Sequence, residues 1–78
     1  MAQTISRPLD LLNCSKNKQV IVELTSGKAY AGTLIAFDIH INIVLDNARE
    51  IINGEQTSSI GQAFFRGDAV VLITPSTI

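Results

Sequence analysis

The chain has 78 residues and a formal net charge of −1, from six Lys and Arg against seven Asp and Glu. This length fits a single domain, residues 1–78, and a core this small gains stability when copies associate. Nucleic-acid binders that neutralise phosphates are usually strongly basic, so such a function here must depend on local geometry. With one cysteine and one histidine, an internal disulfide is excluded, and we expect no metal and no cofactor.

Composition also bears on the compartment. The first residues, MAQTISRPLDLL, lack a basic segment followed by a long apolar stretch and a cleavage site, which argues against secretion. The longest notable apolar runs, AYAGTLIAF and AVVLITP, fall far short of the roughly 20 residues that cross a bilayer. Together with the single cysteine, these features favour the cytoplasm and no contact with a membrane.

Residues 6–17, SRPLDLLNCSKN, are predicted to form one short helix. Ser6 or Arg7 would cap it, Pro8 suits its first turn, and Asp10 would lie near its positive end. Its leucines would form the apolar side that packs on the remainder of the chain.

The rest of the chain, about residues 18–75, is predicted to form five short strands. Alternating apolar residues in QVIVEL and AYAGTLIAF, joined by TSGK, indicate a hairpin, and INIVLDNAREIING gives a third strand. The stretch NGEQTSSIGQ is predicted to be a polar loop, and two apolar strands then flank RGD. Gly32 inside the second strand indicates a sharp bend. We therefore expect a mostly β fold, a short N-terminal helix before a five-stranded, strongly bent antiparallel sheet that closes as a small barrel.

The last strand, AVVLI, is apolar on both faces. An exposed edge strand of this kind pairs readily with another chain. The pattern therefore predicts that copies of the protein associate through their edge strands.

The stretch FDIHINIVLDN carries polar Asp38, His40 and Asn42 at every second position of an apolar run. In an extended chain these side chains would share one face, with Ile39 and Ile41 on the other. On a helix the apolar residues would form no stripe, so the pattern favours an extended segment.

Two stretches resemble the motifs of the Sm-like (LSm) family. Val20 to Leu45 is similar to the first Sm motif, with two glycines and then Asp-x-x-x-Asn beside an apolar strand. Ile60 to Ile73 is similar to the second, in which Arg-Gly precedes a short apolar strand. Archaeal Sm-like proteins carry Asp-x-His-x-Asn and Arg-Gly-Asp together, as this chain does. The resemblance covers about residues 7–75.

The resemblance implies a helix capping a bent barrel, with subunits joined edge to edge in a ring, most often of seven, while six or eight stay open. It implies binding of single-stranded uridine-rich RNA at the central pore, one nucleotide per subunit. The role would be in RNA processing, stability or ribonucleoprotein assembly, with RNA-processing or decay proteins as further partners. It also moves Asp38, His40 and Asn42 from a straight strand to the turn between the second and third strands.

Each of these residue types suits a part in reading uracil. The imidazole of His40 offers a stacking surface, and the planar guanidinium of Arg66 can cover the other face of the base or bond its edge. The amide of Asn42 can match both N3–H and O4 of uracil. If Asp38 holds one proton of that amide, its orientation is fixed, and it fits uracil and opposes cytosine.

The Arg-Gly-Asp segment would complete the site. Gly67 would allow close backbone approach, and Asp68 would orient Arg66 from behind. The candidate RNA-binding residues are Asp38, His40, Asn42, Arg66, Gly67 and Asp68.

Two other functions compete with this interpretation. Asp38 and His40 resemble a base with its orienting acid, but no serine or cysteine is placed as a nucleophile, so we expect no enzyme. A structural ring that scaffolds other proteins without binding RNA is the stronger alternative. The near-neutral charge favours it, whereas the polar trio together with Arg66 counts against it.

Overall fold

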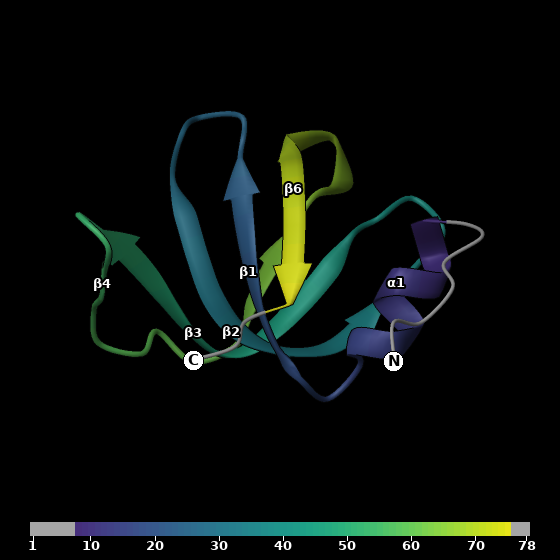
Figure 1. Ribbon diagram of the computed structural model, residues 1–78, viewed down its shortest axis with the longest axis horizontal. Helices are drawn as coiled ribbons and strands as arrows, with labels where there is room; N and C mark the ends of the chain where they lie inside the picture. Colours follow the sequence, from purple (N-terminus) through teal and green to yellow (C-terminus); the bar gives the residue numbers. More distant parts are fainter. Residues whose placement is uncertain (1–7, 76–78) are drawn as a thin grey trace.

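The computed structural model describes residues 8–75 and shows one short helix beside a strongly curved sheet (Figure 1). The predicted helix is confirmed and ends earlier than predicted, since α1 spans Pro8–Ser15 and does not extend to residue 17. The proposed caps, Ser6 and Arg7, lie outside the described residues. No helix within the described part of the chain is long and apolar enough to cross a bilayer.

The chain enters the sheet directly after α1. Asn17 adopts a left-handed φ of 65°, which helical residues do not, and donates its N–H to the carbonyl oxygen of Leu34 at 2.6 Å. The elements that follow are β1 (Gln19–Leu24), β2 (Ala29–Phe37), β3 (Ile43–Ile52), β4 (Glu55–Gln56), β5 (Ala63–Phe65), the 3-10 turn η1 (Gly67–Ala69) and β6 (Val70–Pro75).

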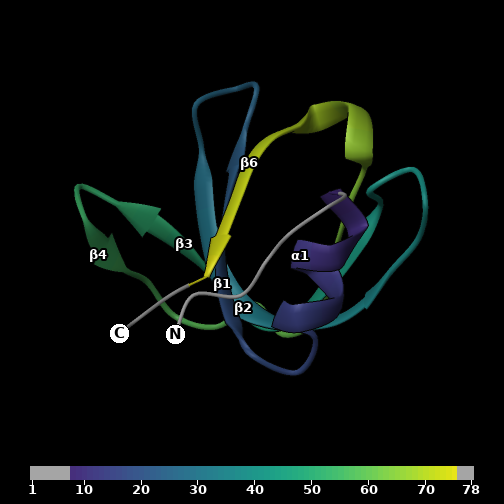
Figure 2. The same cartoon turned by 45° about the vertical axis from the view of Figure 1, so that its right-hand side comes forward.

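The sheet is antiparallel and strongly bent, as predicted. Its order is β4-β3-β2-β1-β6, and β5 pairs with the first part of β3, beside this path. Figures 1 and 2 show β2 and β3 curving, with α1 beside the connection between them. Among the described residues no ladder joins β5 to β6, so the two ends of the sheet are linked through η1 rather than by strand pairing.

Gly32 lies where β2 bends against β3. A Cβ at this position would lie 3.0 Å from the carbonyl oxygen of Asp46, 3.1 Å from Cβ of Leu45 and 3.2 Å from Cα of Ala48. The pairing register of β2 with β3 shifts between Ala31 and Thr33, at the same place. The predicted bend at Gly32 is therefore confirmed, and its cause is the close approach of the β3 backbone.

The core lies inside the curve of the sheet, and α1 covers one side of it. Leu12 is the buried apolar side chain that α1 contributes, and Phe65 of β5 packs on Tyr30 with ring centroids 5.1 Å apart. The buried cluster consists of Leu12, Val20, Val22, Leu34, Ile43, Leu45, Ala48 and Phe65. It holds both ends of the turn between β2 and β3, which carries the polar trio.

The polar loop NGEQTSSIGQ is more ordered than predicted. Its residues Glu55 and Gln56 form β4 and pair with Ile52 and Ile51 of β3, so the sheet has six strands rather than five. An Asn-Gly pair, a strong hairpin signal, precedes β4 and explains the extra strand. The loop then returns to β3, because the N–H of Ile60 donates to the carbonyl oxygen of Ala48 at 2.8 Å.

Candidate nucleic-acid interface

Residues 38–42 form a turn between β2 and β3. The N–H of Asp38 donates to the carbonyl oxygen of Asn42 at 3.1 Å, and Ile41 has a left-handed φ of 64°. The alternation of side chains is thereby broken, and Ile39, expected on the apolar face, is 74% exposed. The extended segment predicted from periodicity is wrong, and the turn implied by the Sm motif is what the structure has.

The carboxylate of Asp38 organises this turn. Its Oδ1 accepts hydrogen bonds from the backbone N–H groups of His40 at 2.8 Å and Asn42 at 3.1 Å. Its Oδ2 accepts a third, from Nδ2 of Asn42 at 3.1 Å. The Asn42 amide first, and then the backbone donors, hold the pKa of Asp38 below its ordinary value. The carboxylate is therefore ionised at neutral pH and serves purely as an acceptor.

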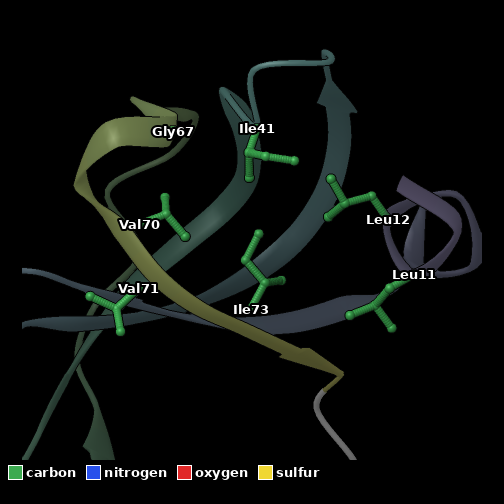
Figure 3. Close-up of a pocket in the computed structure, with 7 residues that line it drawn as sticks. All are labelled: Leu11, Leu12, Ile41, Gly67, Val70, Val71 and Ile73. Atoms are coloured by element: carbon green, nitrogen blue, oxygen red, sulfur yellow. The ribbon is translucent and has the colours of Figure 1, made fainter. Parts of the chain in front are cut away.

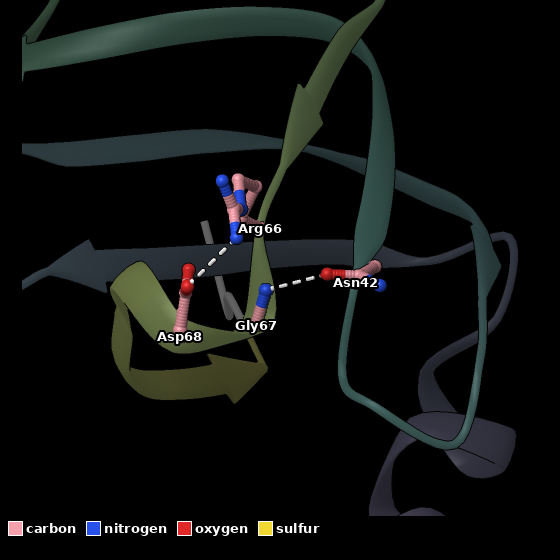
Figure 4. A network of polar contacts seen from close by, with 4 residues as sticks. All are labelled: Asn42, Arg66, Gly67 and Asp68. Atoms are coloured by element: carbon pink, nitrogen blue, oxygen red, sulfur yellow. Dashed lines mark hydrogen bonds and ion pairs between the residues drawn. The ribbon is translucent and has the colours of Figure 1, made fainter.

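The amide of Asn42 joins the two Sm motifs. While Nδ2 donates to Asp38, Oδ1 accepts the backbone N–H of Gly67 at 2.8 Å, as Figure 4 shows. If the amide turned over, Nδ2 would face the N–H of Gly67 and Oδ1 would face the carboxylate of Asp38, and neither hydrogen bond could form. The oxygen therefore faces Gly67, and the nitrogen faces Asp38.

Gly67 lies directly against the turn. A Cβ there would overlap the carbonyl oxygen of His40 and lie 3.0 Å from the carbonyl carbon of Ile41. Both are backbone atoms of a turn that hydrogen bonds hold in place, so they cannot easily give way. The close approach predicted for Gly67 is present, and it sets the η1 backbone against the turn.

Arg66 and Asp68 lie on either side of Gly67. Nη2 of Arg66 is 3.0 Å from Oδ2 of Asp68, and both side chains are exposed to solvent (Figure 4). This is the contact expected from a carboxylate that orients the guanidinium. An exposed pair of this kind contributes about 0–1 kcal/mol, so its effect is on the position of Arg66 more than on stability.

Five of the six predicted site residues line one open depression of about 440 Å³. Asp38 does not line it and contacts the site through the backbone of His40 and through Asn42. The lining residues are His40, Asn42, Arg66, Gly67 and Asp68. The depression thus places an imidazole, a guanidinium and an oriented amide around one space.

Sequence reasoning missed one contact and suggested another that is absent. The bond from Gly67 to Asn42 spans 25 positions, and no local pattern in the sequence signals it. Asp38 bonds the backbone of His40 and not its imidazole, so the pair does not have the geometry of a base with its orienting acid. An Asp two residues before a turn N–H is a recurrent turn former, which is the signal that favours the backbone contact.

Comparisons with known proteins identify relatives of this chain by sequence. The LSM domain model matches residues 10–75. An Sm-like protein of Archaeoglobus fulgidus is 49% identical over 70 residues, which cover 90% of this chain and 91% of that protein. An Sm-like protein of Thermococcus sibiricus is 47% identical over 72 residues, which cover 92% of this chain and 95% of that protein.

Solved structures of archaeal Sm proteins are also similar to this chain. The Pyrococcus abyssii Sm protein in complex with a uridine heptamer has a TM-score of 0.84 and 42% identity, over 91% of this chain and 100% of that one. A heptameric archaeal Sm protein has a TM-score of 0.79 and 37% identity, over 86% of this chain and 97% of that one. The chain therefore belongs to the LSM domain family of Sm-like proteins.

Proposed function

We propose that the protein is a subunit of a homo-oligomeric ring that binds single-stranded, uridine-rich RNA at its central pore, one nucleotide per subunit. The observation that carries the proposal is the Asn42 amide, which is held between Asp38 and Gly67 and lines an open depression. The similar Pyrococcus abyssii Sm protein forms a complex with a uridine heptamer, which supports uridine as the ligand.

The proposed site would hold one base by its faces and its edge. His40 would stack on one face and Arg66 on the other, and stacking on such surfaces contributes about 1–3 kcal/mol per base. Asn42 would donate to O4 of uracil and accept from N3–H. Cytosine in the same position would set its amino group against Nδ2 and its bare N3 against Oδ1, so the fixed amide opposes it.

Edge strands would join the subunits. Within residues 8–75, β5 pairs with β3 alone and β6 with β1 alone, so each has one unpaired edge. Phe64 of β5 is 64% exposed, and Val71 and Leu72 of β6 are also exposed, at 61% and 49%. Addition of β5 from one copy to β6 of the next would pair both edges and cover these side chains.

An apolar groove next to β6 would receive part of the neighbouring copy (Figure 3). It has a volume of about 250 Å³ and lies between α1 and β6, so strand addition on β6 would bring the partner's β5 to its rim. A heptameric archaeal Sm protein of similar fold supports seven subunits. The groove is lined by Leu11, Leu12, Ile41, Gly67, Val70, Val71 and Ile73.

The ring would act in RNA processing, stability or ribonucleoprotein assembly by binding, without catalysis, and in the cytoplasm. RNA-processing or decay proteins would be its further partners. The alternative is a ring that scaffolds proteins and does not bind RNA. A titration with RNA distinguishes the two functions.

The test is a titration of a uridine heptamer RNA into the intact ring, with ring size measured by native mass spectrometry. The wild type is expected to bind, and Asn42→Ala and Arg66→Ala rings are expected to bind at least tenfold more weakly. Asn13→Ala, on the exposed side of α1, and Lys28→Ala, in the β1–β2 turn, are matched controls that should bind as the wild type does. An assembled wild-type ring that does not bind would leave the scaffold function.

A further inference from the structure

The atoms of the Asn42 amide that are free to bind a ligand define a wider class of base than uracil alone. We propose that the site reads the keto–imino edge, an adjacent C=O and N–H, and so accepts hypoxanthine and guanine ahead of cytosine. This deepens the proposed function and rests on it. It reverses the order that ring size alone would give, because cytosine has the same shape as uracil and the purines do not.

The hydrogen bonds within the protein use only part of the hydrogen-bonding capacity of the Asn42 amide. A primary amide has two N–H donors and two lone pairs on its oxygen. One donor of Asn42 is used by Oδ2 of Asp38, and one lone pair is used by the N–H of Gly67. One donor and one acceptor are left for a ligand.

Both internal partners lie on the backbone side of the amide. The Asp38 carboxylate also accepts the backbone N–H of Asn42, at 3.1 Å, so it lies close to that backbone. Gly67 lies against the carbonyl groups of His40 and Ile41, which precede Asn42 in the chain. The unused donor and acceptor therefore point away from the backbone, side by side, with the acceptor toward Gly67.

A base must present an acceptor and a donor in the matching order. Uracil does so with O4 and N3–H, and guanine and hypoxanthine do so with O6 and N1–H when the sugar lies on the same side. Cytosine and adenine present an amino group and a bare ring nitrogen in that order, so each would set donor against donor and acceptor against acceptor. The amide therefore separates keto bases from amino bases.

The shape of the site does not exclude a purine. His40, Arg66 and Asp68 are all exposed, and the depression that they line opens to solvent. The imidazole and guanidinium would stack on any base, since every base has a planar face. Selection against cytosine must then come from the edge, and selection against a purine is weaker.

The test uses uridine heptamers in which the central nucleotide is uridine, inosine, guanosine, cytidine or 3-methyluridine. The last of these keeps both carbonyl groups and the ring of uracil, but a methyl group replaces the N3 hydrogen, so the donor is lost and the edge is blocked. Binding to the unmodified ring is measured by fluorescence anisotropy, so no variant has to fold. The inosine heptamer is expected within about threefold of uridine, and the cytidine and 3-methyluridine heptamers at least about fivefold weaker, the lower limit for one lost bidentate pair. Guanosine is expected between these groups.

The outcomes separate the two proposals. If the uridine heptamer binds and the inosine heptamer binds more weakly than the cytidine heptamer, the keto–imino reading is wrong and the proposed function stands. If the uridine heptamer itself does not bind to an assembled ring, the proposed function is wrong. As a further check, an assembled Asn42→Ala ring should bind all five heptamers within about threefold of one another, because the edge is no longer read.

Discussion

The backbone N–H of Gly67 donates to Oδ1 of Asn42 over 2.8 Å and joins two segments that lie 25 positions apart. This bond couples the position of η1 to the orientation of the amide, and the absence of a Cβ on Gly67 makes it possible. Folding of the second motif onto the first and orientation of the Asn42 amide are therefore coupled.

Gly67→Ala is expected to destabilise the fold and to weaken RNA binding together. The added Cβ would overlap the carbonyl oxygen of His40, so η1 must move away and the bond to Asn42 is lost. We expect a loss of about 1–3 kcal/mol in the free energy of unfolding, measured by chemical denaturation. Gly54→Ala is the control: it adds strain at a φ of 82° with no atom in the way, and it should leave RNA affinity unchanged. Unchanged stability and binding in Gly67→Ala would show that the two segments are not rigidly coupled.

Asp38→Ala is expected to reduce base selectivity more than base affinity. Without the carboxylate, Nδ2 of Asn42 loses its internal acceptor, and the amide can turn to match cytosine as well as uracil. The measurement is the ratio of affinities for uridine and cytidine heptamers in a ring whose size has been verified. Asp46→Ala is the control, because within residues 8–75 the carboxylate of Asp46 bonds only the backbone N–H of Asn47. A preserved preference for uridine would mean that Gly67 alone orients the amide.

The lowered pKa of Asp38 predicts how this contribution varies with pH. A carboxylate whose pKa is lower in the folded protein than in the unfolded chain stabilises the fold at a pH above the unfolded value. That stability is lost as the pH falls through the lower, folded value. The difference in unfolding free energy between wild type and Asp38→Ala should therefore be constant from pH 6 to pH 8 and shrink in the acid range below the ordinary value of 3.8. A difference that grows on acidification would contradict the hydrogen-bond scheme.

More of the fold than of the candidate site could be predicted from the sequence. Gly32 indicates a bend because a glycine inside a strand has few other uses, and the apolar strands carry their own pattern. The alternation of the polar trio led to a wrong prediction of an extended segment. The left-handed φ of Ile41 changes the face to which each following side chain points. The bond between Gly67 and Asn42 depends on how the chain folds back, so no window of sequence contains it.

Salt should weaken RNA binding only slightly. The site offers one cation, Arg66, whose guanidinium is shared with Asp68, and the chain carries a net charge of −1. Each phosphate neutralised on a single strand contributes about 0.7 to the slope of log affinity against log salt. We expect a slope per bound nucleotide below about 0.7, measured for the uridine heptamer between 50 and 500 mM KCl. A steeper slope would mean that contacts to phosphates, and not to bases, dominate the binding.

Phe64→Ser is expected to prevent ring assembly while leaving the fold of the subunit intact. Phe64 is 64% exposed on β5, whereas the neighbouring Phe65 fills the core, so the substitution removes an outward contact and not a buried one. An aromatic anchor at an interface commonly contributes about 2 kcal/mol or more, and every interface of a ring would lose it. Native mass spectrometry should show monomers, and uridine heptamer affinity should fall because the sites are no longer linked. Ile60→Ser, at 61% exposure but outside the paired edges, should keep the ring. A Phe64→Ser ring that stays assembled would mean that the subunits do not meet along β5.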